Sequence, residues 1–224
     1  MTFCNFPLLD EPIFLNEHEG TVLSIEPKEV YAKIVYSLYQ KATGISPDYP
    51  FLLFDDNYKE IPKATIIHNP MLYDLNTLAL KKALFQRIID TMDVEERISV
   101  EKNYANITNY FKQEIFEDVN IEVAISESYK LESLFKLLQI DILDETASIF
   151  EKSQLVLNVL HELGKNELVI FCGLSDFLVE SEYELFLETA NFNQQQILLI
   201  ERNRVQQKNT TSFFLDNDFV LWKD

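Results

Sequence analysis

A run of five apolar residues at 168–172, which stops at Gly173, limits the possible folds more than any other part of the chain. Runs of this length and composition are typical of buried strands in a parallel sheet that helices cover on both faces. A helix is predicted just before the run, over about 146–163, with Gly164 at its C-terminal cap. A second apolar run at 196–201 predicts another buried strand, so the C-terminal third indicates an α/β fold.

The N-terminal part has the same character. Further strands are predicted at 21–26, 51–56 and 64–69, and a last short one at 219–222. Pro27 suits the first turn of an amphipathic helix that continues to about residue 41, because its missing N–H is harmless there. Ser181 with Glu184 predicts a capping box that opens another helix near the C-terminus.

Between about residues 75 and 145 the pattern changes to helices. Three apolar stripes recur at helical spacing: Leu80, Leu84, Ile88 and Met92; Val100, Tyr104, Ile107, Phe111 and Ile115; and Leu131, Leu134, Phe135 and Leu138. Such spacing predicts an antiparallel helical hairpin or bundle. The stripes are either the inner faces of packed helices or, in part, contacts with another subunit. We therefore expect an α/β head domain formed by residues 1–74 and 146–224, with a helical leg domain inserted at 75–145.

Composition sets limits on function. Hydrophobic residues make up 47% of the 224 residues, which is enough for a real core. The formal net charge of −18 argues against nucleic acid as a partner, although a locally basic surface can exist on an acidic protein. The sequence has no signal-peptide pattern and no long apolar run, so we expect no contact with membrane and a cytoplasmic location. Cys4 and Cys172 are expected to be small buried side chains, with a disulfide as the alternative.

The sequence lacks the motif of a phosphate-binding loop. That loop needs two glycines five residues apart, followed by Lys and Ser or Thr. Gly164 and Lys165 match two of these positions, but Val159 and Asn166 occupy the others, and the segment leads from helix into strand rather than the reverse. With only four glycines in the chain, a dinucleotide fingerprint is missing too. We expect no bound nucleotide.

Motifs for catalysis are weak. The three histidines are scattered and complete no zinc motif, and no GxSxG or Cys–His pair is present. Glu26 and Lys28 at a predicted strand end, with Asp10 upstream, give the loose outline of a metal-dependent nuclease. The alternative is that Glu26 and Lys28 are an exposed helix start. The sequence therefore offers no positive indication of an enzyme.

Carboxylates gather in one part of the helical insert. Residues 113–128 contain Glu114, Glu117, Asp118, Glu122 and Glu127. Hard oxygen ligands of this kind suit Ca²⁺, which tolerates irregular geometry, although the glycine and spacing of an EF-hand are missing. A solvated acidic face is the alternative.

Four segments together resemble one known family. They are NFPLLDEPIFL near the start, FKLLQIDI late in the insert, IFEKSQLVLNVLHELGKNELVIFCGLSDFL, and QQQILLIERN. In this order they resemble the short accessory protein of type II-A CRISPR systems that acts in spacer acquisition, and the likeness covers nearly the whole chain. The resemblance implies an α/β head like a P-loop NTPase without a functional nucleotide site, and an inserted helical leg.

The resemblance also implies a function. Proteins of this family form a homotetrameric ring that encloses double-stranded DNA, loads at free DNA ends and is stabilised by calcium. They have no known catalytic activity, and they work with the integrase complex and the effector nuclease of the same locus. On this basis we expect DNA to be contacted by Lys28, Lys33, Lys130 and Lys136, and calcium to be bound by Asp118, Glu122 and Glu127. The alternative for each lysine is a solvated side chain without a ligand. A DNA-blind protein adaptor is the third alternative.

Overall fold

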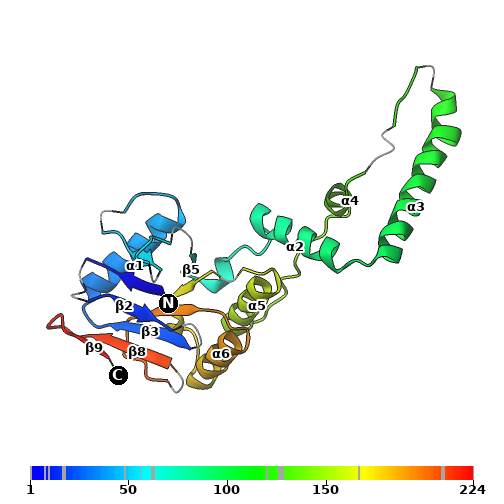
Figure 1. Cartoon of the computed structure of the whole chain (residues 1–224). Helices are drawn as coiled ribbons and strands as arrows, with labels where there is room; N and C mark the ends of the chain where they lie inside the picture. Colours follow the sequence, from blue (N-terminus) through cyan, green and yellow to red (C-terminus); the bar gives the residue numbers. More distant parts are fainter. Residues whose placement is uncertain are drawn as a thin grey trace. The chain divides into compact units, whose positions relative to one another are not determined.

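The chain divides into two compact units in the computed structural model (Figure 1). The structure describes all residues except 1, 8, 10, 17, 18, 48, 56, 62, 63, 120, 126–128, 166, 208, 209 and 224. One unit, which we call the head, consists of residues 1–74 and 144–224. The other, which we call the leg, consists of residues 75–143.

A six-stranded sheet forms the centre of the head. Its strands, in spatial order, are β5 (Thr65–Ile67), β6 (Val169–Cys172), β7 (Ile197–Glu201), β3 (Gly20–Ile25), β8 (Thr210–Leu215) and β9 (Leu221–Lys223). All neighbours are parallel except β8 and β9. The apolar runs at 168–172 and 196–201 are adjacent, fully buried strands of this sheet, so that prediction is confirmed.

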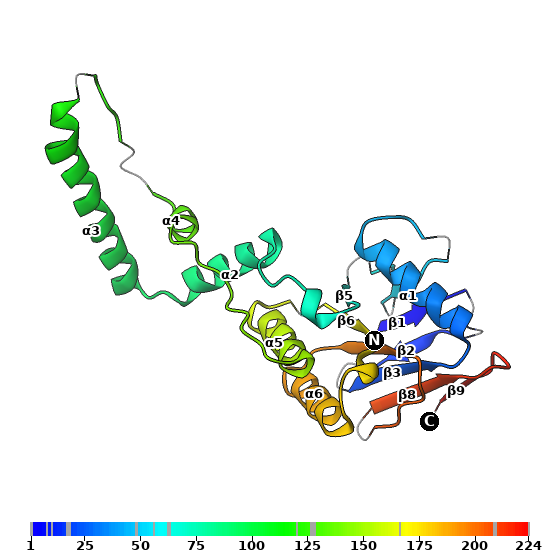
Figure 2. The same cartoon turned by 180° about the vertical axis from the view of Figure 1, so that it is seen from behind.

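Helices lie on both faces of the sheet. They are α1 (Lys28–Ala42), α5 (Ile149–Glu162) and α6 (Glu180–Phe192), and α1 lies on the opposite side from the other two (Figures 1 and 2). The alternation along β6 explains this arrangement, since Ile170 belongs to the core cluster that includes α1, whereas the ring of Phe171 packs edge-on against Phe186 of α6 with centroids 5.0 Å apart. The helix–sheet–helix layers follow from these two-sided apolar strands.

A second, antiparallel sheet completes the core beside α1. Its order is β2 (Ile13–Leu15), β1 (Thr2–Asn5) and β4 (Leu52–Phe54). Cys4 of β1 is fully buried in the same core cluster as α1. Cys4 and Cys172 are both free and buried, which confirms that they act as small core side chains and not as a disulfide.

The ends of two head helices test the cap predictions. Gly164 follows α5 with a left-handed φ of +64°, and the next N–H, that of Lys165, returns to the carbonyl of Leu160 at 2.8 Å, as expected of a C-terminal glycine cap. The predicted capping box of Ser181 and Glu184 is wrong. The helix begins before Ser181, because the Glu182 carboxylate accepts the N–H of Val179, the cap residue, at 3.1 Å.

The leg contains three α-helices: α2 (Leu78–Thr91), α3 (Val94–Tyr110) and α4 (Leu131–Leu137). A π-helical turn, η2 (Phe111–Ile115), and a 3-10 turn, η3 (Phe116–Asp118), extend α3. The start of α3 is fixed by a capping box in which Asp93 and Glu96 each accept the other's backbone N–H. Phe85 of α2 and Phe135 of α4 pack with ring centroids 5.5 Å apart, so α2 and α4 share a small apolar core.

The apolar stripe of α3 does not face another helix of the leg. The described residues that return beside α3 are irregular, with the ring of Tyr129 stacked on Tyr104 at 4.6 Å, so the predicted helical hairpin is wrong at this point. Ile107 is 58% exposed and Ile115 40%. A helix-period pattern predicts only which face is apolar, and the described residues of the leg leave these two side chains of that face exposed.

None of the helices in the described part of the chain is both long and apolar enough to span a membrane.

Candidate functional site

A groove of about 630 Å³ lies between α2 and α4, and we call it the leg groove. Its lining consists of Leu78, Lys81, Lys82, Phe85, Glu132, Lys136, Gln139, Ile140 and Asp141. The two helices are brought together by the Phe85–Phe135 contact and by Asn76, which bonds both backbone groups of Ile142. These hydrogen bonds, of 3.0 and 2.8 Å, hold the chain after α4 beside the start of α2.

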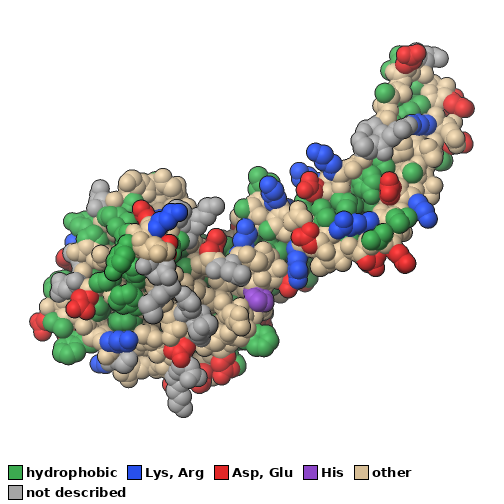
Figure 3. Space-filling view, in the orientation of Figure 1, with side chains coloured by type: hydrophobic (Ala, Val, Ile, Leu, Met, Phe, Trp, Pro, Cys, Tyr) green, Lys and Arg blue, Asp and Glu red, His purple; other side chains and the backbone are tan. Residues whose placement is uncertain are grey.

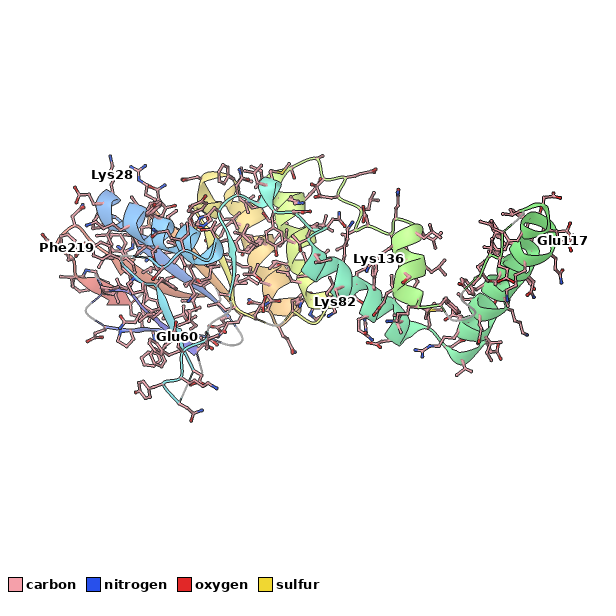
Figure 4. The ribbon with its side chains drawn as sticks, turned by 90° about the horizontal axis from the view of Figure 1, so that it is seen from above. Lys28, Glu60, Lys82, Glu117, Lys136 and Phe219 are labelled. Atoms are coloured by element: carbon pink, nitrogen blue, oxygen red, sulfur yellow. The ribbon has the colours of Figure 1, made fainter. Side chains whose placement is uncertain are left out.

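Lysine side chains border the leg groove. Lys81 forms an ion pair with Asp141. Within the described residues, neither Lys82 nor Lys136 has an ion-pair partner, even though Glu132 lies one helical turn before Lys136. Both ammonium groups extend from exposed positions of neighbouring helices (Figure 4). An anionic group is the natural ligand of such a rim.

The leg is also the less acidic part of the protein. It carries eight Lys and Arg against twelve Asp and Glu, whereas the head carries eleven against twenty-five. Figure 3 shows the basic side chains distributed along the leg. Most of the net charge of −18 therefore lies on the head. The leg repels an anionic ligand less than the head does, so the net charge is a weaker argument against anion binding by the leg.

The four lysines predicted to contact DNA fall in two places. Lys130 and Lys136 lie at the start and near the end of α4, in the leg. Lys28 and Lys33 lie on α1, in the head, where both are exposed and the ammonium of Lys33 lies 5.3 Å from the centre of the Tyr49 ring. Lys82 was not among the predicted residues, and the Lys81–Lys82 pair on an amphipathic helix is the signal that could have found it.

Two of the three predicted calcium ligands lie within the described residues. Asp118 ends η3, Glu122 is exposed in the segment that follows, and Glu127 lies outside the described residues. Across the part of the chain that the structure describes, no three acidic, His or Cys side chains come close enough to hold a metal. Carboxylates suit Ca²⁺ chemically, and calcium binding stays a prediction.

The nuclease outline is likewise incomplete. Glu26 and Lys28 are exposed at the end of β3, and Asp10 lies outside the described residues. Only Glu26 and Pro27 separate β3 from α1. A phosphate-binding loop needs several backbone N–H groups between strand and helix, and two residues, one of them proline, cannot provide them.

A buried carboxylate that no sequence motif indicates lies at the same edge of the sheet. Glu201 ends β7 with no exposed surface. It accepts hydrogen bonds from the Ser175 hydroxyl at 2.7 Å, the Ser175 N–H at 3.2 Å and the Tyr183 hydroxyl at 3.0 Å. Burial raises the pKa of Glu201 to about 7. Because these donors already occupy its oxygens, we assign Glu201 a structural role.

Cys172 ends β6 next to Glu201 and is buried. Burial, followed by the nearby Glu201 charge, raises the pKa of the Cys172 thiol to about 12, so the reactive thiolate is suppressed. Gly173 turns the chain with a φ of +68°, and a side chain there would approach the Tyr31 hydroxyl to 3.0 Å. Cys172 and Gly173 therefore offer neither an ionised thiol nor room for a further side chain at this edge of the sheet.

Three comparisons bear on the identity of the chain. The family described as "CRISPR-associated protein (Cas_Csn2)" matches residues 46–219. Two curated relatives, both described as "CRISPR-associated protein Csn2", come from Streptococcus agalactiae and Enterococcus faecalis. They are 29% and 28% identical over 222 residues, which cover 97% of this chain and 96% of each relative.

A solved structure has a similar fold. It is described as "Crystal structure of Stu0660 of Streptococcus thermophilus" and superposes with a TM-score of 0.61 and 12% identity. The alignment covers 96% of this chain and 74% of that one. At this identity the likeness concerns the fold alone.

Proposed function

The chain belongs to the Csn2 family of CRISPR-associated proteins, and from this premise we propose that it acts in spacer acquisition as a non-catalytic protein that binds the ends of double-stranded DNA. The observation that carries the proposal is the family match over residues 46–219, supported by the near full-length similarity to the curated relatives. In this proposal four copies form a ring around the duplex, and the integrase complex and effector nuclease of the same locus are its partners.

The distribution of charge supports a DNA-binding role. Lys28, Lys33 and Lys130 are exposed cations that can contact phosphates. Lys136, the fourth lysine predicted to contact DNA, is also exposed and lines the leg groove. Since contacts of this kind release counterions, binding should weaken steeply as salt is raised and should depend little on sequence.

The head supports a scaffold role in place of nucleotide chemistry. Its parallel sheet, with β3 between β7 and β8, has the layered form in which nucleotide-binding folds hold phosphate at a strand–helix loop. Here that loop is reduced to Glu26 and Pro27, and the neighbouring strand end carries Cys172 and Gly173. We therefore propose a P-loop-NTPase-like head without a functional nucleotide site, from which the leg is inserted.

A gel-shift comparison tests the proposal. One duplex is prepared in linear and covalently closed circular form, and each is titrated with protein in calcium and in chelator. Binding of the linear form alone would support a ring that threads onto DNA ends, and weaker binding in chelator would support calcium as its stabiliser. Equal binding of both forms would refute threading and indicate a surface patch.

Two other outcomes would favour the alternatives. Cleavage of the duplex with Mg²⁺ or Mn²⁺ that disappears in Glu26→Ala would support the nuclease built on Asp10, Glu26 and Lys28. No binding to either form at low salt with calcium would favour the protein adaptor, in agreement with the acidic head.

A further inference from the structure

A second, smaller pocket of about 260 Å³ lies in the head, and we call it the hairpin pocket. The described residues that line it are all basic or aromatic: Arg204, Phe214, Trp222 and Lys223. Phe214 and Trp222 lie directly opposite each other on β8 and β9, which form the hairpin at the outer edge of the six-stranded sheet (Figure 1). The pocket is therefore separate from the leg groove and from the loop between β3 and α1.

The indole ring of Trp222 is fixed in place, although its side chain is 54% exposed. Its Nε1–H donates to one carboxylate oxygen of Asp216 at 2.7 Å. The other oxygen accepts the backbone N–H groups of Asp218 and Val220 in the hairpin turn, at 3.0 and 2.9 Å. Because the Nε1–H lies at the edge of the indole, these bonds leave the faces of the ring available for stacking.

Two cations lie close to aromatic rings of the hairpin. The guanidinium carbon of Arg204 is 4.9 Å from the centre of the Phe214 ring, and the ammonium of Lys223 is 5.9 Å from the centre of the Phe213 ring. A guanidinium that stacks on a ring keeps its charge and can still donate hydrogen bonds from its edge. The hairpin pocket thus places positive charge beside an exposed aromatic face, in a head whose acids outnumber its bases.

A nucleotide matches both features of the pocket. A simple anion would use the cations and leave the rings uncovered, whereas an apolar side chain would cover the rings and leave the cations without a ligand. A nucleotide has a flat base that stacks on aromatic rings and a phosphate that accepts hydrogen bonds from Arg and Lys. The volume is below the range of about 300 to 1,000 Å³ for drug-sized ligands, which favours one nucleotide unit over a longer strand.

We propose that the hairpin pocket binds one nucleotide unit, with its base stacked on Trp222 and its phosphate held by Arg204 and Lys223. A base inside a duplex is already stacked on both faces, so the ligand is either a free nucleotide or an unpaired nucleotide at a DNA end. This inference goes beyond the proposed function, in which phosphate contacts alone bind the duplex. It depends neither on a ring nor on calcium.

The fluorescence of Trp222 reads the pocket directly, because it is the only tryptophan in the chain. The full-length protein is titrated with deoxyadenosine monophosphate, with deoxyadenosine and with inorganic phosphate. The monophosphate should quench the emission saturably, and deoxyadenosine should bind about tenfold more weakly, because it lacks the charged phosphate. Phosphate alone should leave the emission unchanged and compete with the monophosphate.

Variants show which side chains hold the phosphate. Arg204→Gln/Lys223→Gln keeps the tryptophan and should weaken the monophosphate about tenfold. Lys223→Gln alone lies at the end of an edge strand and tests the same contact without disturbing the core. Lys59→Gln/Lys102→Gln, two exposed lysines outside the pocket, is the matched control and should bind the monophosphate as the wild type does.

Two duplexes distinguish the sources of the nucleotide. One is blunt, and the other carries a short single-stranded extension of thymidines. Quenching by the extended duplex at lower concentration than by the monophosphate would assign the pocket to unpaired DNA ends, and quenching by the monophosphate alone would assign it to a free nucleotide.

Three results would overturn the inference. They are no quenching by either ligand, equal quenching by the blunt and extended duplexes, and unchanged binding of the monophosphate in the Gln variants while circular dichroism shows the native fold. Each of these would leave the binding of duplex ends, measured by gel shift, unaffected.

Discussion

Replacing Glu201 by Gln should make the stability of the head less dependent on pH. The Glu201 side chain is fully buried, and its carboxylate accepts hydrogen bonds from Ser175 and Tyr183. Burial has the largest effect on its pKa, which rises to about 7 even though these hydrogen bonds lower it. Glutamine has nearly the same shape and stays neutral, so it substitutes for the protonated carboxyl at every pH.

The unfolded chain releases the proton of Glu201 first, because there the pKa has its ordinary value of 4.5. Between pH 4.5 and about 7 the folded protein holds a proton that the unfolded chain lacks, so the free energy of unfolding falls as pH rises. The difference between the two pKa values, at about 1.36 kcal/mol per pH unit, amounts to a loss of about 3 kcal/mol that is complete above pH 7.

Urea unfolding of wild type and Glu201→Gln at about pH 5.5 and about pH 8 measures this loss. Both values lie above the sequence pI of 4.5, where the protein stays charged. The stability of the variant relative to the wild type should rise by about 2 kcal/mol between them, since part of the loss already occurs below pH 5.5. Glu184→Gln, at an exposed position of α6, is the control and should show no such change. A constant difference for Glu201→Gln would refute the raised pKa.

Three further changes probe the fold, each measured by urea unfolding. Gly173→Ala should cost about 1 to 2 kcal/mol, because φ is +68° and the new methyl group meets the Tyr31 hydroxyl; an unchanged stability would contradict the strain. Asp144→Ala should lower the free energy of unfolding by about 3 to 5 kcal/mol, because it leaves the ammonium of Lys152, whose side chain is 2% exposed, without its partner. Lys152→Met removes the buried charge as well and should lower the free energy of unfolding less. A larger loss in Lys152→Met than in Asp144→Ala would contradict this reasoning. Asn76→Ala should cost the leg about 1 to 3 kcal/mol through two lost backbone hydrogen bonds, with faster amide exchange in the leg and not in the head.

The sequence predicts the central strands well because their pattern is physically unambiguous. A strand buried on both faces needs an unbroken apolar run, and residues 168–172 and 196–201 provide it. β8 was missed because its run begins with Thr210, Thr211 and Ser212, which carry no apolar signal. β1 and β2 were missed because strands of four and three residues are too short to show a period.

The candidate site is harder to predict because it depends on tertiary contacts. Lys82 and Lys136 are more than fifty residues apart in sequence, and only the packing of Phe85 on Phe135 brings their helices together around a groove. Glu201 was overlooked because a polar residue at the end of an apolar strand usually marks the surface, whereas here Ser175 and Tyr183 make its burial possible. Periodicity predicts which face of α3 is apolar, but it cannot say which molecule covers that face.

The paired hydrogen bonds between Asn76 and Ile142 have a consequence for how this protein can change over evolutionary time. They join the two ends of the leg across 66 residues, so the intervening chain leaves and returns at one point. The entropy of closing such a loop grows only slowly with its length, at about 0.6 kcal/mol per doubling. Insertions and deletions between these residues should therefore change the free energy of folding of the head only slightly. The length of the leg can then diverge among relatives that keep the same head.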